Sequence, residues 1–254
     1  MQKYGSLLAN PQCPAHHKTD NLRLSATPFT PMKTVSVRIW DLPTRLFHWL
    51  LALCVVALIV TAKIGGNAME WHLRLGHAVL ALLAFRLVWG VAGGHWSRFA
   101  VFVPRPAQLA AYLRGGLATV GHNPLGALSV LAMLAVLIVQ VLSGLASDDE
   151  IAFAGPLTRW VSGETVAWAT QWHKGWGQWL VIGLIALHLC AIAYYTLVRR
   201  QRLVASMLHG HQAAPAHTPS SRDQLPQRLL ALVVFALCAV AAWWLYRQGG
   251  TPVL

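Results

Sequence analysis

Four histidines within the long apolar stretches of this 254-residue chain are the first candidates for chemistry. They are His48, His72, His173 and His188. An ionisable side chain inside a membrane-spanning segment is energetically costly, so it usually marks a functional site. Neutral imidazole is a strong axial ligand of haem iron, and an iron held by two imidazoles has no position open to substrate. Paired histidines on apolar helices therefore predict haems that transfer electrons.

The spacing along the last of these stretches places its two histidines at different depths. His173 and His188 lie 15 residues apart, which on a helix is about 22 Å along the axis and about 60° around it. Because successive spans run in opposite directions, His188 shares a level with His48, and His173 shares a level with His72. We therefore predict two haems, each held by one histidine pair.

Other chemistries fit these histidines less well. A zinc site needs four ligands that converge on one point, which the separation along the helix forbids. A proton relay usually includes a buried Asp or Glu, and the interiors of these stretches contain neither. Any single histidine could instead form a hydrogen bond between helices, but two pairs at matching depths favour haem.

One ligand position has two candidates. His77 follows His72 by five residues, and so lies about 140° around the helix from it. The two side chains therefore cannot face the same haem. We favour His72, because it lies nearer the membrane edge, as His173 does.

Two arginines are predicted to contact the haem propionates. Arg86 lies 14 residues beyond His72, about 21 Å deeper and about 40° off the same face, and Arg45 lies three residues before His48. Propionates are anionic, and the guanidinium group is a fork-shaped partner for carboxylates. The alternative is that the arginines extend to lipid headgroups.

Two further histidines fall at predicted helix ends. For His95 and His122 a capping or interface role is favoured over ligation. His122, in the run GHNPLG, could also form a hydrogen bond with a propionate or a quinone.

The composition indicates a membrane protein. Apolar residues make up 56% of the chain and charged residues 11%, with a mean hydropathy of +0.50, whereas a soluble domain needs a more charged surface. The net charge of +12 lies in short segments between apolar runs, which is typical of membrane proteins, so we expect no nucleic-acid partner. The four scattered cysteines include no C-x-x-C-H motif, so the haems are predicted to be non-covalent.

Five apolar runs are long enough, at roughly 20 residues, to cross a bilayer as helices. They predict an all-α integral membrane fold: a four-helix transmembrane bundle that binds two haems b, plus a fifth, C-terminal transmembrane helix. The fifth run contains no histidine, so we expect it only to anchor or pack. The predicted spans are residues 46–62, 71–92, 124–146, 172–198 and 229–246.

The basic residues predict the orientation of the chain. They gather before the first span, between the second and third, and between the fourth and fifth. The positive-inside rule places these segments in the cytoplasm. The N-terminus is then cytoplasmic and the C-terminus periplasmic, in a bacterial inner (plasma) membrane.

The chain divides into four segments by composition. Residues 1–34 are polar and rich in proline, which indicates a disordered leader or, because a compact sequence begins at Met32, a misassigned start. Residues 35–205 form the predicted di-haem domain. Residues 206–227 are predicted to be a flexible cytoplasmic linker, and residues 228–254 the additional helix and a short tail.

Four runs of sequence form a recognisable combination. They are VRIWDLPTRLFHWLLA, EWHLRLGHAVLALLAFRLVWG, GHNPLGALSVLAMLAVLIVQVLSG and WHKGWGQWLVIGLIALHLCAIAYY. Over residues 35–200 the chain resembles the bacterial cytochrome b561 family, which includes the b-type cytochrome subunits of nickel–iron hydrogenases. The resemblance implies four helices that carry two haems on the four histidines named first. It also favours His72, which precedes Gly76 by four residues as the family's histidine precedes a glycine. The fifth helix departs from the family's four-helix pattern.

The resemblance implies a function in electron transfer. We expect a membrane cytochrome that connects the quinone pool with a redox partner: a periplasmic cytochrome, a dehydrogenase or a hydrogenase. The alternative is a self-contained oxidoreductase, such as a superoxide:quinone oxidoreductase, because some relatives are thought to oxidise superoxide. An electron-transfer subunit is favoured over a stand-alone enzyme.

Overall fold

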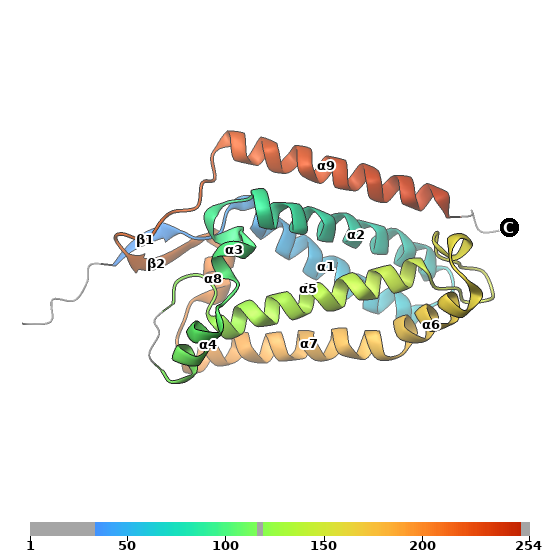
Figure 1. Cartoon of the computed structure of the whole chain (residues 1–254), viewed down its shortest axis with the longest axis horizontal. Helices are drawn as coiled ribbons and strands as arrows, with labels where there is room; N and C mark the ends of the chain where they lie inside the picture. Colours follow the sequence, from blue (N-terminus) through green and yellow to red (C-terminus); the bar gives the residue numbers. More distant parts are fainter. Residues whose placement is uncertain (1–33, 116–118, 250–254) are drawn as a thin grey trace, which may run out of the picture. The chain divides into compact units, whose positions relative to one another are not determined.

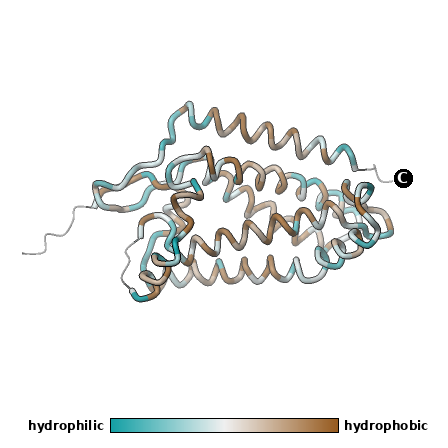
Figure 2. Tube along the Cα trace, in the orientation of Figure 1, coloured by the Kyte–Doolittle hydropathy of each residue, from teal (hydrophilic) through white to brown (hydrophobic). Residues whose placement is uncertain are grey.

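The computed structural model describes residues 34–115 and 119–249 of the chain (Figure 1). The predictions for the leader and for a start at Met32 therefore lie outside the described residues, apart from residue 34. Within the described residues, five helices are long and apolar enough to cross a membrane, as the sequence predicts, and Figure 2 shows apolar residues along their length. They are α1 (Leu42–Ile64), α2 (Ala68–Ala92), α5 (Pro124–Leu145), the helical stretch Gly163–Val198, and α9 (Leu225–Gln248).

Short polar caps fix where several of these helices begin. The Asp41 side chain accepts a hydrogen bond from the Thr44 amide at the start of α1, and the Asn123 side chain accepts one from the Gly126 amide at the start of α5. Each cap is followed by a proline in the first turn, where its fixed φ suits a helix and its missing N–H costs nothing. The caps extend α1 four residues upstream of the predicted span.

The fourth span is not one continuous helix. It consists of α6 (Gly163–Lys174), α7 (Trp176–Ala193) and the π-helical turn η3 (Tyr194–Val198), with a break at Gly175. Gly175 has φ −101° and ψ −110°, which is not helical, and a Cβ at this position would lie 2.5 Å from the Gln171 carbonyl oxygen. The predicted fourth span is confirmed, but its helix is interrupted at Gly175, so the calculated 60° between its histidines does not hold across the break.

Helix α2 occupies the centre of the bundle. It packs against α1, α5 and α9, and α5 packs against both α6 and α7. The apolar core gathers around Val79, Leu82, Leu83 and Phe85 of α2. Many apolar side chains of the other spans are exposed, which is expected where helices face lipid tails. The predicted packing role of the fifth helix is seen in its contact with α2 (Figure 1).

The predicted flexible linker instead contains regular structure. Helix α8 (Leu203–His209) ends at Gly210, which has a positive φ of 85°, and strand β2 (His211–Pro215) pairs antiparallel with β1 (Thr34–Arg38). The Ser221 hydroxyl donates a hydrogen bond of 2.6 Å to the Ile39 carbonyl. These bonds satisfy backbone groups on both segments, so residues 206–227 pack against the segment that precedes α1. The two strands are also an addition to the predicted all-α fold.

Four shorter helices complete the described elements. They are η1 (His95–Ser97), α3 (Phe99–Phe102), α4 (Pro106–Leu113) and η2 (Thr158–Trp160).

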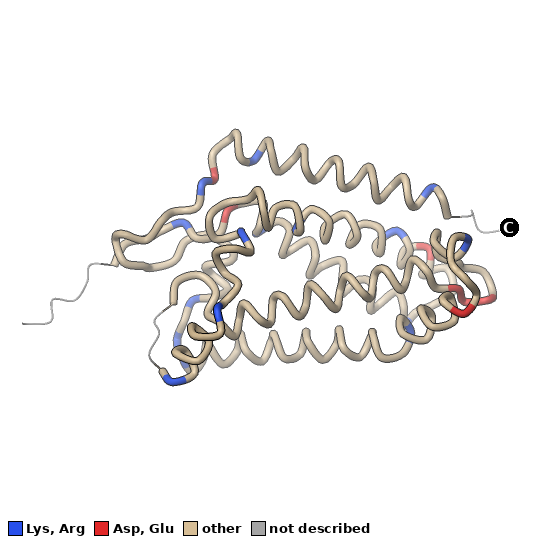
Figure 3. Tube along the Cα trace, viewed as in Figure 1, with Lys and Arg blue, Asp and Glu red and all other residues tan. Residues whose placement is uncertain are grey.

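The two ends of the bundle differ in charge (Figure 3). The end that carries β1, β2, α4 and α8 has arginines and few acidic residues, and we call it the arginine-rich end. Its arginines are Arg38, Arg45, Arg98, Arg105, Arg114, Arg199, Arg200, Arg202, Arg222 and Arg228. The opposite end mixes both signs, with acidic residues Glu70, Asp148, Asp149, Glu150 and Glu164. This asymmetry is typical of a protein oriented by the positive-inside rule.

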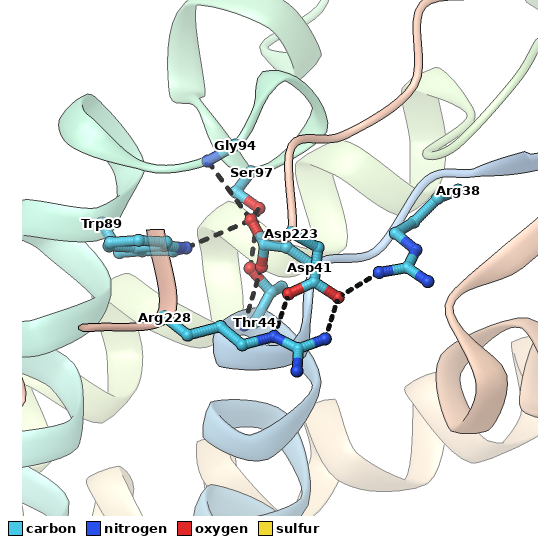
Figure 4. A network of polar contacts seen from close by, with 8 residues as sticks. All are labelled: Arg38, Asp41, Thr44, Trp89, Gly94, Ser97, Asp223 and Arg228. Carbon is cyan, nitrogen blue, oxygen red and sulfur yellow. Dashed lines mark hydrogen bonds and ion pairs between the residues drawn. The ribbon is translucent and has the colours of Figure 1, made fainter. Parts of the chain in front are cut away.

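Two acidic side chains connect separate segments of the chain at the arginine-rich end (Figure 4). Asp41 is fully buried and accepts hydrogen bonds from the Thr44 amide (2.9 Å), the Ser97 hydroxyl (2.9 Å), the Gly94 amide (3.2 Å) and the Trp89 indole N–H (3.3 Å). It therefore joins the start of α1 to the end of α2.

The second acidic side chain, Asp223, joins the segment before α9 to β1. Its carboxylate accepts from Arg38 Nη1 at 2.6 Å, and from Arg228 Nε at 3.0 Å and Nη2 at 3.2 Å. Burial of the carboxylate raises its pKa, but the hydrogen bonds and charges of Arg228 and Arg38 outweigh this, so that the pKa of Asp223 lies below its ordinary value.

Asp223→Asn is expected to destabilise the fold by about 1–2 kcal/mol at pH 7, because Arg38 and Arg228 lose a charged partner but remain partly exposed. A carboxylate whose pKa is depressed stabilises the fold above its unfolded pKa of about 3.9, and this contribution is lost as the pH falls through the folded pKa. Thermal unfolding of both proteins at pH 7 and pH 3 checks this. The difference between them should shrink at pH 3, and a difference independent of pH would contradict the role of the ion pair.

Candidate functional site

The structure places the four predicted histidines in two pairs. His48 on α1 and His188 on α7 have ring centroids 6.4 Å apart, with an angle of 55° between the ring planes. His72 on α2 and His173 on α6 have centroids 6.1 Å apart at 85°. Each pair consists of the two histidines that the spacing along the spans predicts to lie at the same depth.

The separation within each pair can be compared with that of two imidazoles on one metal ion. Metal–imidazole bonds are about 2.0–2.1 Å, and the ring centroid lies roughly 1.1 Å beyond the nitrogen, so two opposed ligands have centroids about 6 Å apart. Both observed separations are close to this value. Each separation therefore fits two imidazoles that share one metal ion.

Backbone carbonyls orient the rings of the second pair. His72 Nδ1 lies 3.0 Å from the Leu58 carbonyl oxygen, and His173 Nδ1 lies 2.8 Å from the Gln140 carbonyl oxygen. A carbonyl only accepts hydrogen bonds, so Nδ1 carries the proton in each ring and Nε2 keeps a free lone pair. This is the arrangement that metal-bound histidines usually show.

Gln140 also holds the chain at the break before α7. Its side-chain amide donates a hydrogen bond of 2.9 Å to the His173 carbonyl, which replaces a bond that a continuous helix would supply. Gln140 is not among the predicted site residues, although a glutamine in the middle of the apolar run 124–145 is a recognisable signal.

A cavity of about 580 Å³ adjoins the second pair. His72 and His173 line it, with Gly76 on α2 and Gly144 on α5. A Cβ on Gly144 would lie 2.7 Å from Cε1 of the His173 ring, whereas a Cβ on Gly76 would meet no atom within 4 Å. The glycines therefore leave room for the His173 ring and for a flat group beside it. The volume is in the usual range for cofactor sites, roughly 300–1,000 Å³.

Near the first pair, several buried polar atoms have no hydrogen-bond partner among the described residues. They are Arg45 Nε, His48 Nδ1, Arg86 Nη1 and His122 Nδ1. The two arginine nitrogens are donors. A buried donor without a partner is costly, and the carboxylates of a haem would supply acceptors for them. The residues at this level thus fit a haem as well.

Arg86 does not extend to the membrane surface. Its side chain is buried, 3% exposed, and its guanidinium carbon lies 4.7 Å from the centroid of the Phe99 ring and 5.6 Å from that of Phe102. These contacts are cation–π interactions. The alternative that Arg86 reaches lipid headgroups is therefore wrong.

His122 lies in the same region, packed against aromatic rings. Its centroid is 4.6 Å from that of Trp40 and 5.0 Å from that of Phe102. Burial, followed by the charges of Arg86 and His48, lowers the pKa of His122 to about 4. The ring is therefore neutral at neutral pH, in an interface position as the sequence indicates.

His77 does not join the second pair. Its ring packs edge-on against Tyr246 of α9, with centroids 5.1 Å apart, and its Nδ1 lies 2.8 Å from the Leu73 carbonyl oxygen. Of the two candidates on α2, the structure brings His72 to His173.

These observations define a class of protein. The chain is a multi-pass helical membrane protein whose bundle brings histidines together in two pairs, one near each end. Comparison with known proteins identifies the family. The model of the prokaryotic cytochrome b561 family matches residues 39–210, so the chain belongs to this family, whose b-type cytochromes imply haem b.

Curated relatives carry related names. The chain is 25% identical over 210 residues to a probable Ni/Fe-hydrogenase B-type cytochrome subunit of Cupriavidus necator. The alignment covers 68% of this chain and 86% of the relative. A subunit of the same name from Azotobacter chroococcum is 27% identical, over 70% of this chain and 89% of the relative. The probable Ni/Fe-hydrogenase 1 B-type cytochrome subunit of Escherichia coli is 21% identical, over 70% and 92%. No solved structure gave a significant match.

Proposed function

We propose that this chain is a di-haem b-type cytochrome that carries electrons between a redox partner protein and the quinone pool. The observation that carries the proposal is the presence of two histidine pairs with centroids 6.4 Å and 6.1 Å apart. Two imidazoles leave no iron position open to substrate, which suits electron transfer.

Each histidine has one role in this proposal. His48 and His188 would hold one haem b, and His72 and His173 would hold the other. Bound haem supplies one-electron redox chemistry. Arg45 and Arg86 supply hydrogen bonds and positive charge to the propionates of the haem between His48 and His188, which satisfies their unpartnered buried nitrogens.

The break at Gly175 supports the second haem site. It ends α6 at the turn that presents His173, and Gln140 fixes both the carbonyl and the ring of that residue. A ligand held in this way keeps its orientation before the haem binds. We therefore assign His173 on α6 and His72 on α2 to the second site. The ring of each is held by a hydrogen bond to a backbone carbonyl.

The redox partner is proposed from the names of the relatives. Their names associate them with nickel–iron hydrogenases, so a hydrogenase is the first candidate, with a dehydrogenase or a periplasmic cytochrome as the others. We place the arginine-rich end in the cytoplasm by the positive-inside rule, with the N-terminus cytoplasmic and the C-terminus periplasmic. The His72–His173 pair then lies toward the periplasm.

Reduction by quinol tests the proposed function. When the purified holoprotein in lipid nanodiscs is mixed anaerobically with decylubiquinol or menadiol, the visible spectrum should show haem reduction within seconds. Reduction by dithionite in the same sample gives the full amplitude, and quinol in empty nanodiscs is the control. Full reduction by dithionite with none by either quinol would contradict exchange with the quinone pool.

A further inference from the structure

A second cavity of about 580 Å³ lies between α2, α9 and part of α1. Its walls include small side chains on both facing helices, Ala78 and Ala81 on α2 and Ala239 and Ala242 on α9. The match to the family model ends at residue 210, before α9 begins at Leu225. One wall of this cavity therefore comes from a helix outside the family match.

The polar residues of this cavity gather toward one end of the two helices. His77, Arg74 and Tyr246 line it there, beside the aromatic side chain of Trp243. The His77 ring contacts Tyr246, with centroids 5.1 Å apart, so this ring faces α9. The remaining walls are apolar.

One ring nitrogen of His77 has a hydrogen-bond partner among the described residues and the other has none. Nδ1 faces the Leu73 carbonyl at 2.8 Å and so carries the proton. Nε2 is then an acceptor, and it is buried without a hydrogen-bond partner among the described residues. A buried acceptor without a donor is costly. A ligand with an O–H or N–H group would supply the missing donor.

His77 also lines the cavity that adjoins the His72–His173 pair. The two cavities therefore share a wall, and a ligand in the α9 cavity lies one side chain away from the proposed site of the second haem.

From these observations we propose that the cavity between α2 and α9 is a quinol-binding site, in which a quinol hydroxyl donates a hydrogen bond to His77 Nε2 and the ring packs beside Trp243 and Tyr246. The inference rests on the proposed function, because it locates the quinone that exchanges electrons with the haems. A quinol combines a flat ring, a hydroxyl donor and an apolar tail, which match the aromatic end, the unpartnered acceptor and the alanine-lined walls.

Phospholipid is the competing occupant. An acyl chain would fill the apolar walls, but it brings no donor to His77 Nε2. The two occupants can be separated by photolabelling the holoprotein in nanodiscs with an azido-ubiquinone, with excess decylubiquinol as competitor, and by mapping the labelled peptides by mass spectrometry.

Three variants make the test specific. Ala239→Leu fills the cavity, and His77→Phe removes the acceptor; Val240→Leu is the matched control, because Val240 is the next residue on α9 and is 62% exposed. The proposal predicts label in the segment Leu225–Gln248, displaced by decylubiquinol, and at least tenfold weaker in the first two variants but unchanged in the control. Haem spectra of all three should match the wild type, which shows that they fold.

Label that is absent from α2 and α9, or equal in all three variants, would overturn the proposal. So would native mass spectrometry that shows a phospholipid held by the wild type and lost in Ala239→Leu while labelling is unchanged. If quinol still reduces the haems in those cases, the proposed function stands and the site is elsewhere. If the label maps to the cavity but quinol fails to reduce the haems, the binding site stands and the proposed function fails.

Discussion

Substitution of single histidines should remove the haems one pair at a time. His48→Ala and His188→Ala should each abolish the haem between α1 and α7 and leave most of the other. His72→Ala and His173→Ala should do the reverse. The reason is that, in the proposed function, each pair shares one iron, with ring centroids about 6 Å apart, and a single imidazole holds haem b poorly.

The haem content of the purified variants, from pyridine haemochrome spectra and redox titration, measures this effect. Each variant should keep about half of the wild-type haem, and members of one pair should retain the same redox component. His211→Ala is the control for haem content, because His211 is exposed on β2 and lies outside both pairs. Loss of the same component from His48→Ala and His173→Ala would contradict the pairing.

Loss of the Asp41 side chain should have the largest effect on stability. Asp41→Ala removes the cap of α1 and leaves the Ser97 hydroxyl, the Gly94 amide and the Trp89 indole N–H without their acceptor. A lost cap costs about 1 kcal/mol and each buried unsatisfied group about 1–3 kcal/mol, so we expect a loss of about 3 kcal/mol or more.

Thermal unfolding in detergent measures this loss. Asp41→Asn should recover part of it, because an amide oxygen still accepts two of the hydrogen bonds. Glu164→Ala, at an exposed position in the first turn of α6, is the control and should change stability little. An Asp41→Ala protein as stable as this control would show that the network in Figure 4 contributes little.

The pairing of the histidines could be predicted because it depends only on depth. A helix rises by a fixed amount per residue, so positions along antiparallel spans determine which histidines share a level. The predicted pairing holds despite the break at Gly175. One non-helical residue changes the depth of the histidines by little, although it alters the angle between them around the axis.

Contacts between distant segments could not be predicted in this way. Nothing in the run HQAAP marks it as the partner of TVSVR, and the pairing of β1 with β2 depends on how the chain returns after α8. The prolines and histidines of this segment instead predict a flexible linker. Asp41 is a similar case, because its partners on α2 and in the following turn lie 48–56 residues away.

The position of the fifth helix could not be predicted from the sequence either. Its apolar pattern is nearly uniform, so it does not indicate which face packs. The structure sets it against α2, and this contact brings Tyr246 to His77. His77, which the sequence presents as a rival to His72, therefore lies in a separate environment.

The haem content of the wild-type protein tests the central claim most directly. The purified holoprotein, assayed by pyridine haemochrome against protein concentration from amino-acid analysis, should contain two haems b per chain, both extracted by acidified acetone because the chain has no C-x-x-C-H motif to attach them. A ratio of one haem per chain, or haem that stays with the protein after extraction, would contradict the account of two histidine pairs that each hold one haem b.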